Sequence, residues 1–109
     1  MSTGVKICGL RTCQSIDAAI DAGASHYGLV FFPKSPRNVT LAEAASLADH
    51  ARGRIVAVAL TVDATDELLD GIARTVRPDM LQLHGSETPE RAAQIRKLTG
   101  LPVIKAVSI

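Results

Sequence analysis

Three segments of the sequence carry side chains that can move protons or bind anions. Lys6 and Cys8 lie two residues apart in the first apolar run. A thiol has a pKa of about 8.5, so part of it is thiolate near neutral pH, and a positive neighbour such as Lys6 increases that part. Arg37 follows the second apolar run, and a guanidinium binds a carboxylate through two parallel hydrogen bonds. His84 ends the fourth run, and Gly85 after it would leave room for a ligand beside the backbone.

Each of these residues also has a structural interpretation. A cysteine outside a motif is most often a small buried hydrophobic residue, and this is our interpretation of Cys13. Arg37 could be a solvated loop residue, and an isolated histidine such as His84 is usually structural. Asp63 follows the third apolar run and could serve as an acid, but we expect it in the turn that leads to the next helix.

Short apolar runs alternate with helical patterns along the chain, and this places the candidate residues at strand ends. Apolar spacing, threonine caps and glycine or proline breaks predict helices over 12–22, 40–51, 65–76 and 88–98. Thr40 and Glu43 have the spacing of a capping box at the start of the second helix. Apolar runs predict strands over 5–8, 27–32, 55–62, 80–83 and 103–107.

Strands that alternate with helices predict an α/β fold with a parallel sheet, either doubly wound or closed into a (β/α)8 barrel. The glycine fingerprint of dinucleotide-binding folds is missing after the first strand. Lys6 and Cys8 share one strand face, as do Gln82 and His84, and a barrel interior can hold such polar side chains. One strand and its helix take about 25 residues, and eight such units would make a small barrel. We therefore expect a partial barrel of about four βα units plus a fifth strand.

Composition argues against several functional classes. The 109 residues are 47% hydrophobic and 21% charged, which is typical of one globular domain. A net charge of +1 argues against a nucleic-acid or membrane surface that works through bulk charge. The cysteines and histidines lack the spacing of zinc ligands, and we expect His26 and His50 at the surface. We expect a cytoplasmic protein with no metal site and no nucleic-acid or membrane partner.

Three motifs resemble the phosphoribosylanthranilate isomerase family of tryptophan biosynthesis. They are Lys6-Ile7-Cys8-Gly9-Leu10, Phe32-Pro33-Lys34-Ser35-Pro36-Arg37 and Leu81-Gln82-Leu83-His84-Gly85. The resemblance covers essentially the whole chain, but only about the first half of the family's usual length. It implies a TIM barrel that performs a cofactor-free Amadori rearrangement of N-(5-phosphoribosyl)anthranilate to 1-(2-carboxyphenylamino)-1-deoxyribulose 5-phosphate.

The resemblance also implies roles for individual residues. Cys8 is expected to be the base that removes the proton from C2 of the sugar. Arg37 is expected to contact the anthranilate end of the substrate, and we expect His84 and Lys6 to contact the substrate as well. The family's acid is an aspartate of the sixth strand, and its phosphate site is formed by loops after strands seven and eight. Neither lies within these 109 residues.

We therefore expect residues 1–109 to be the N-terminal half of a single barrel domain, inactive alone. The first and fifth strands would be open edges, which a second copy or a C-terminal half could cover. Two alternatives stay open: a non-catalytic half-barrel that assembles with another chain, and another phosphosugar barrel enzyme such as indole-glycerol-phosphate synthase. The Cys-Gly motif after the first strand disfavours the latter enzyme, for which a lysine pattern is expected there.

Overall fold

The computed structural model describes residues 6–105, except for the side chain of Cys8. Five parallel strands form one sheet, and their spatial order is their order in the sequence. The strands are β1 (Lys6–Cys8), β2 (His26–Phe31), β3 (Val56–Thr61), β4 (Met80–Leu83) and β5 (Val103–Lys105). The helices are α1 (Cys13–Asp21), α2 (Leu41–Ala51), α3 (Asp66–Gly71), which continues into the π-helical turn η1 (Ile72–Val76), and α4 (Pro89–Thr99).

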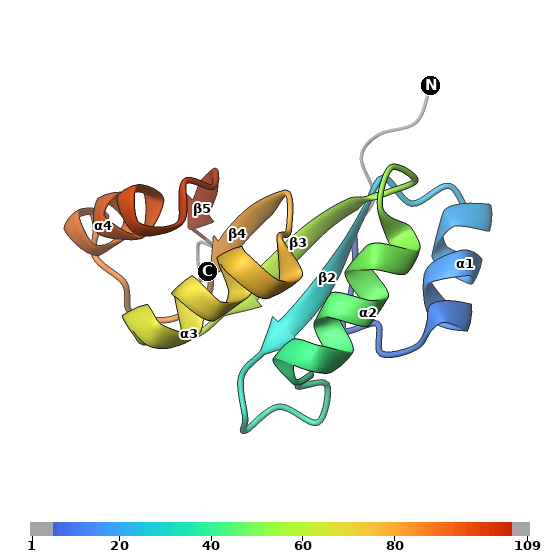
Figure 1. Ribbon diagram of the computed structural model, residues 1–109, viewed down its shortest axis with the longest axis horizontal. Coiled ribbons are helices and arrows are strands. Elements are labelled where there is room, and N and C mark those ends of the chain that lie inside the picture. Colours follow the sequence, from blue (N-terminus) through green and yellow to red (C-terminus); the bar gives the residue numbers. More distant parts are fainter. Residues whose placement is uncertain (1–5, 106–109) are drawn as a thin grey trace.

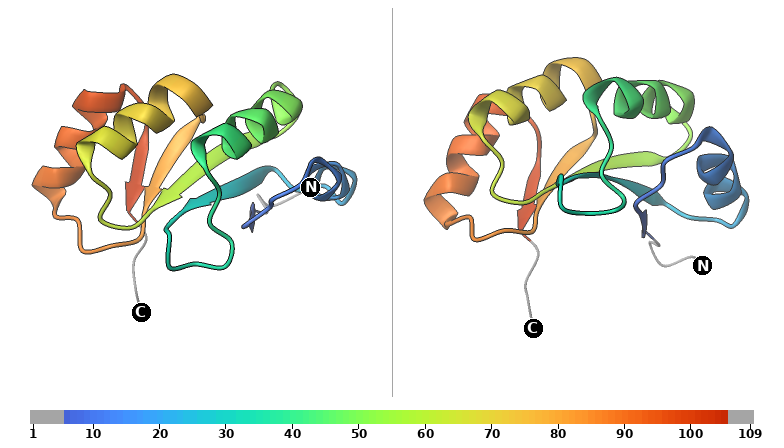
Figure 2. Two further views of the ribbon diagram at one scale, coloured as in Figure 1. Left: turned by 60° about the horizontal axis from the view of Figure 1, so that its bottom comes forward. Right: turned by 90° about the horizontal axis from the view of Figure 1, so that it is seen from below.

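The helices cover one face of the sheet, and the sheet curves so that its other face is concave (Figure 1 and Figure 2). A doubly wound sheet would have a strand order that reverses at a switch point and helices on both faces. The consecutive order and the single helix layer are those of successive βα units in a barrel. The expected partial barrel is therefore confirmed.

Threonine caps determine where the helices begin. Each of α1 to α4 starts directly after a threonine whose hydroxyl accepts a hydrogen bond from a backbone N–H of the first turn. Such caps satisfy N–H groups that have no partner inside the helix. Thr40 and Glu43 form the expected capping box, with hydrogen bonds of 3.1 Å and 2.9 Å. Local chemistry thus sets the end of each loop that follows a strand.

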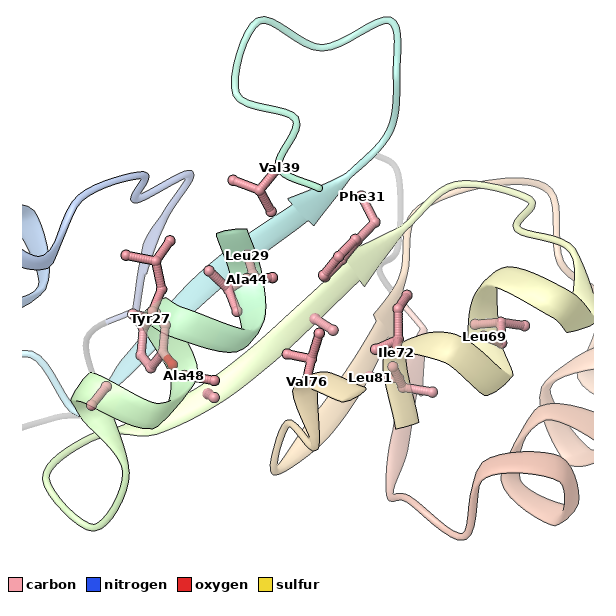
Figure 3. Packing of buried hydrophobic residues seen from close by; sticks show 14 of the residues in the cluster. Tyr27, Leu29, Phe31, Val39, Ala44, Ala48, Leu69, Ile72, Val76 and Leu81 are labelled. Carbon is pink, nitrogen blue, oxygen red and sulfur yellow. The ribbon is translucent and has the colours of Figure 1, made fainter. Parts of the chain in front are cut away.

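The hydrophobic core lies between the sheet and the helices. Tyr27, Leu29 and Phe31 of β2 face α2 and are at most 3% exposed (Figure 3). Ile72 of η1 and Leu81 of β4 are fully buried in the same cluster. Because strand side chains alternate between the two faces, the residues between these positions point to the concave side.

The concave face brings distant strands together. The Lys6 ammonium donates a hydrogen bond to Gln82 Oε1, although β2 and β3 lie between β1 and β4. In a flat sheet these two strands would be about 14 Å apart, so the contact depends on the curvature. This face is partly covered: both residues are half-buried, and Ile104 on the edge strand β5 is 44% exposed.

Some element ends differ from the predicted ones. The sequence predicts one helix over 65–76, but α3 ends at Gly71 and its last turn widens, because the Arg77 N–H donates to the Ile72 carbonyl at 3.0 Å. The second strand begins at His26, one residue earlier than predicted. The predicted strands over 5–8 and 103–107 each extend beyond the described residues, so β1 and β5 are confirmed only over the parts given above.

Candidate active site

The carboxyl ends of the five parallel strands lie along one edge of the sheet, and this edge carries the candidate residues. Cys8 is the last residue of β1 and pairs in register with Gly28 of β2. Gly9 continues the pairing, because its N–H donates to the Gly28 carbonyl at 2.9 Å. The backbone of the Cys-Gly motif is therefore held at this edge, while the side chain of Cys8 lies outside the described part of the structure.

The loop after β2 folds back over the same edge. The Val39 N–H donates to the Val30 carbonyl at 3.0 Å, which closes the loop onto the strand it left. A guanidinium nitrogen of Arg11 donates to the Pro36 carbonyl at 3.1 Å, which ties the loop to the segment after β1. These bonds bring Arg37 close to the end of the first strand.

The Arg37 side chain lies against Gly9. An ideal Cβ placed on Gly9 would be 2.3 Å from Arg37 Cδ and 3.2 Å from Arg37 Nε. Arg37 is exposed, and no carboxylate among the described residues pairs with its guanidinium. The structure thus brings the arginine of the second motif beside the backbone that follows Cys8 in the first.

Lys6 and His84 approach one another across the concave face. Lys6 contacts Gln82, which lies two residues before His84 on the same side of β4. Partial burial lowers the pKa of His84, and the positive charges of Lys6 and Lys105 lower it further, against an opposing effect of Glu87. The imidazole is therefore mainly neutral at neutral pH and has one donor and one acceptor nitrogen.

Sequence reasoning missed a buried carboxylate at this edge. The Glu87 side chain is 3% exposed, and its Oε1 accepts from the Lys105 ammonium at 3.0 Å. Its Oε2 accepts from the Asp63 N–H at 2.8 Å. Burial raises the pKa of Glu87, but the hydrogen bonds from Lys105 and two backbone N–H groups lower it by more, so the group is a carboxylate near neutral pH. The available signal was its place between the strand end at His84 and the helix cap at Thr88.

Asp63 belongs to the same network. It lies in the turn after β3, as expected, with a φ of 47°. Its Oδ1 accepts from the Ser86 N–H at 2.8 Å, and an ideal Cβ on Gly85 would be 2.5 Å from Asp63 Cγ. The ends of β3, β4 and β5 are thus joined around His84 by side-chain hydrogen bonds.

The remaining cysteine and histidines lie away from this edge. Cys13 is the half-buried first residue of α1. His50 Nε2 lies 2.8 Å from Asp17 Oδ1, between α1 and α2. His26 and His50 were expected at the surface; both are half-buried, and the His50 side chain between α1 and α2 is 32% exposed.

Among residues 6–105, hollows beside the sheet bring no further candidate residue to this edge. A hollow of about 270 Å³ lies between β5 and α4, lined in part by Thr88, Pro89 and Lys105. Another, of about 370 Å³, includes Ser25 and Asp79 and lies at the amino ends of the strands. Within the part of the chain that the structure describes, no three histidine, cysteine or carboxylate side chains gather as a metal site would require.

Residues 5–109 match the family model for N-(5'phosphoribosyl)anthranilate (PRA) isomerase. Curated proteins named N-(5'-phosphoribosyl)anthranilate isomerase from Brucella canis and Brucella suis are each 59% identical to the chain over all 109 residues. The match covers 49% of each of these proteins, so the chain spans about half the length of the curated relatives it matches.

Solved structures of similar proteins have the same fold. Phosphoribosyl anthranilate isomerase from Thermotoga maritima superimposes with a TM-score of 0.91 at 30% identity, covering 99% of this chain and 52% of that chain. The isomerase from Thermus thermophilus gives a TM-score of 0.88 at 30% identity, with 98% and 52% covered. A structure with reduced 1-(o-carboxyphenylamino)-1-deoxyribulose 5-phosphate bound gives 0.91 at 30% identity, with 99% and 55% covered.

Proposed function

The chain belongs to the N-(5'-phosphoribosyl)anthranilate isomerase family, and from this premise we propose that residues 1–109 supply the first half of an isomerase active site. The completed enzyme converts N-(5-phosphoribosyl)anthranilate into 1-(2-carboxyphenylamino)-1-deoxyribulose 5-phosphate. The sugar ring opens, a proton leaves C2 and C1 takes one up. C2 is oxidised as C1 is reduced, so the rearrangement balances without an external oxidant or cofactor.

Cys8 is the proposed base of this reaction. Its position at the carboxyl end of β1 is where barrel enzymes place catalytic groups. Lys6, from the same strand, brings a positive charge that favours the thiolate. A second group must protonate the ring oxygen as the ring opens, and we assign this acid to the part of the barrel that follows these residues.

One observation carries the assignment of the substrate's aromatic end to this edge. The Arg37 guanidinium, which pairs with no carboxylate of residues 6–105, lies across Gly9, directly after Cys8. The anthranilate carboxylate is the anion it would bind, through two parallel hydrogen bonds. Lys6 and His84, which belong to the concave side of the sheet, are proposed to contact the sugar part of the substrate.

The proposed enzyme is a single barrel domain of which residues 1–109 form the N-terminal half. The open edges at β1 and β5 favour completion by further βα units. A relative from Thermotoga maritima is described as dimeric, and we propose that completed barrels of this protein also pair. No helix in residues 6–105 is long and apolar enough to cross a membrane, and we propose a cytoplasmic location for the enzyme.

Replacement of the proposed base tests the function. The assay uses a completed barrel, defined here as residues 1–109 joined to the second half of the Brucella canis relative. Wild-type protein is expected to rearrange the substrate, and Cys8→Ser is expected to lower kcat by at least about 10²-fold, because a positioned proton-transfer group contributes that much. Cys13→Ser is the matched control and should leave kcat unchanged. A Cys8→Ser effect below about threefold would make Cys8 a structural residue.

The Arg37 assignment has its own test in the same protein. Arg37→Ala is expected to weaken substrate binding by about 1.5–3 kcal/mol, the range for a hydrogen bond to a charged group. Arg37→Lys should recover part of this loss, because an ammonium keeps the charge but cannot bind bidentately. A lysine variant with wild-type affinity would contradict bidentate binding.

A further inference from the structure

We propose that Gly9 is a positioning residue of the substrate site, because its bare α-carbon is the surface on which the Arg37 side chain lies. The absence of a side chain at Gly9 leaves the space in which the Arg37 stem lies beside the end of β1. The inference rests on the proposed function in one respect, since it takes Arg37 as the ligand of the substrate carboxylate.

The contact leaves no room for a methyl group. A Cβ on Gly9 would lie 2.3 Å from Arg37 Cδ, 3.1 Å from Cγ and 3.2 Å from Nε, whereas carbon atoms in contact lie about 3.5–4.0 Å apart. The Gly9 backbone cannot easily move away, because its N–H is bonded to the Gly28 carbonyl at 2.9 Å. The arginine stem would therefore have to leave its place.

Comparison with three other glycines distinguishes the lack of space at Gly9 from the need for a positive φ. Gly9, Gly23, Gly53 and Gly100 all have a positive φ, between 70° and 86°, which glycine adopts without strain. A Cβ on any of the last three would meet nothing within 4 Å. Among the positive-φ glycines in residues 6–105, Gly9 alone combines this conformation with close contact to a side chain.

Contact with Gly9 lowers the entropic cost of ordering the Arg37 side chain when it binds a ligand. A solvated arginine loses much rotamer freedom when it clamps a ligand. Here the stem lies against Gly9, and the loop that carries it is bonded to Arg11 through the Pro36 carbonyl. Groups fixed before the ligand arrives bind it at a smaller entropic cost.

The first experiment measures the order of Arg37 directly, without any assay of activity. In the completed barrel, the Nε–H resonance of Arg37 in ¹H–¹⁵N spectra should show restricted motion. Gly9→Ala should convert it to the fast motion of a solvated side chain. Gly53→Ala is the matched control, because it has the same positive φ in open space, and it should leave the Arg37 signal unchanged. An Arg37 signal that stays restricted in Gly9→Ala would overturn the inference.

The second experiment tests whether the position of Arg37 on Gly9 contributes to binding of the substrate carboxylate. The probes are reduced 1-(o-carboxyphenylamino)-1-deoxyribulose 5-phosphate and the same compound without its carboxyl group, with affinities from titration calorimetry. Gly9→Ala should weaken the first about tenfold or more and the second less than about twofold. In an Arg37→Ala background, Gly9→Ala should have almost no further effect. Equal weakening of both probes, or additive effects, would mean that Gly9 acts through the backbone and not through Arg37.

The experiments distinguish a failure of the Gly9 proposal from a failure of the proposal that Arg37 binds the substrate carboxylate. If Gly9→Ala frees the Arg37 signal but both probes keep their affinity, Gly9 seats Arg37, and the role of Arg37 as carboxylate ligand is wrong. Should Gly9→Ala fail to fold, Gly9→Asn replaces it, since asparagine tolerates positive φ better than alanine and still adds a Cβ. It should give the same loss of Arg37 order and of selectivity for the carboxylated probe.

Discussion

The ionisation of His84 depends on two lysines from other strands. The Lys6 ammonium of β1 is bonded to Gln82, two residues before His84. The Lys105 ammonium of β5 is bonded to the carbonyl of Gly85, the residue after His84. Partial burial and both positive charges oppose a third positive charge on the imidazole, so His84 should remain neutral under conditions in which a histidine without such neighbours is partly protonated.

This dependence can be measured by proton NMR titration in the completed barrel. The pKa of His84 should lie below its ordinary value of 6.5, and Lys6→Met and Lys105→Met should each raise it. Lys97→Met, on α4, is the control and should leave it unchanged. Because the folded pKa is the lower one, the histidine disfavours folding as pH falls below about 6.5, and this effect levels off below the folded pKa. An unchanged pKa in both lysine variants would show that the lysine charges are not the cause.

At the scale of the elements, the ends of β3 and β4 are held together by a tight contact. Gly85 faces the Asp63 carboxylate so closely that a Cβ would lie 2.5 Å from Asp63 Cγ. The φ of Gly85 lies outside the left-handed region, so an alanine there would clash with Asp63 but would not strain the backbone.

Gly85→Ala should therefore destabilise the protein by about 1 kcal/mol, because the exposed Asp63 carboxylate would have to turn away from its place. The displaced carboxylate would also lose its bond to the Ser86 N–H. Asp63→Gly fits the positive φ at that position and removes the obstacle, so in that background Gly85→Ala should be nearly neutral. Urea denaturation of the four proteins gives the interaction free energy. Additive effects would contradict the contact.

Local patterns in the sequence were enough to predict the elements. The capping box at Thr40 and the cap before Pro89 gave helix starts that the structure confirms. The widened turn η1 was not predictable, because it depends on how the segment before Arg77 packs against α2 and not on residue type.

The candidate site was predictable in part. The motifs placed Cys8 and His84 at strand ends and Arg37 in a loop after a strand, and in the structure β1 ends at Cys8, β4 ends one residue before His84, and Arg37 lies in the loop after β2. The seating of Arg37 on Gly9 and the burial of Glu87 were not predictable, because both depend on which loops the curvature brings together.

At the scale of the whole molecule, the sheet has two open edges and a half-covered concave face. β1 and β5 each present backbone groups that have no neighbouring strand within the described residues. A proton donor for the ring oxygen and a phosphate site are both assigned to the rest of the barrel.

Residues 1–109 alone should therefore show no measurable isomerase activity. Loss of one positioned proton-transfer group costs about 10²–10⁴-fold, and loss of the phosphate anchor removes binding energy that aligns the sugar. A turnover assay on 11.5 kDa material of verified mass tests this. Addition of the separately produced second half of the Brucella canis relative should restore turnover. Activity of the 109 residues alone near that of a whole isomerase would show that a second copy supplies the missing groups.

The consecutive strand order also bears on how the chain is synthesised. Each strand pairs with the next one along the chain, as Lys6 does with His26 and Leu81 with Val103. Every pairing therefore closes a loop of a few tens of residues, which costs less chain entropy than pairing strands far apart in the sequence. A sheet ordered in this way can grow from its amino end while the ribosome is still adding later units. The unpaired edge would move along the nascent chain with translation, and each new unit would cover the edge left by the one before it.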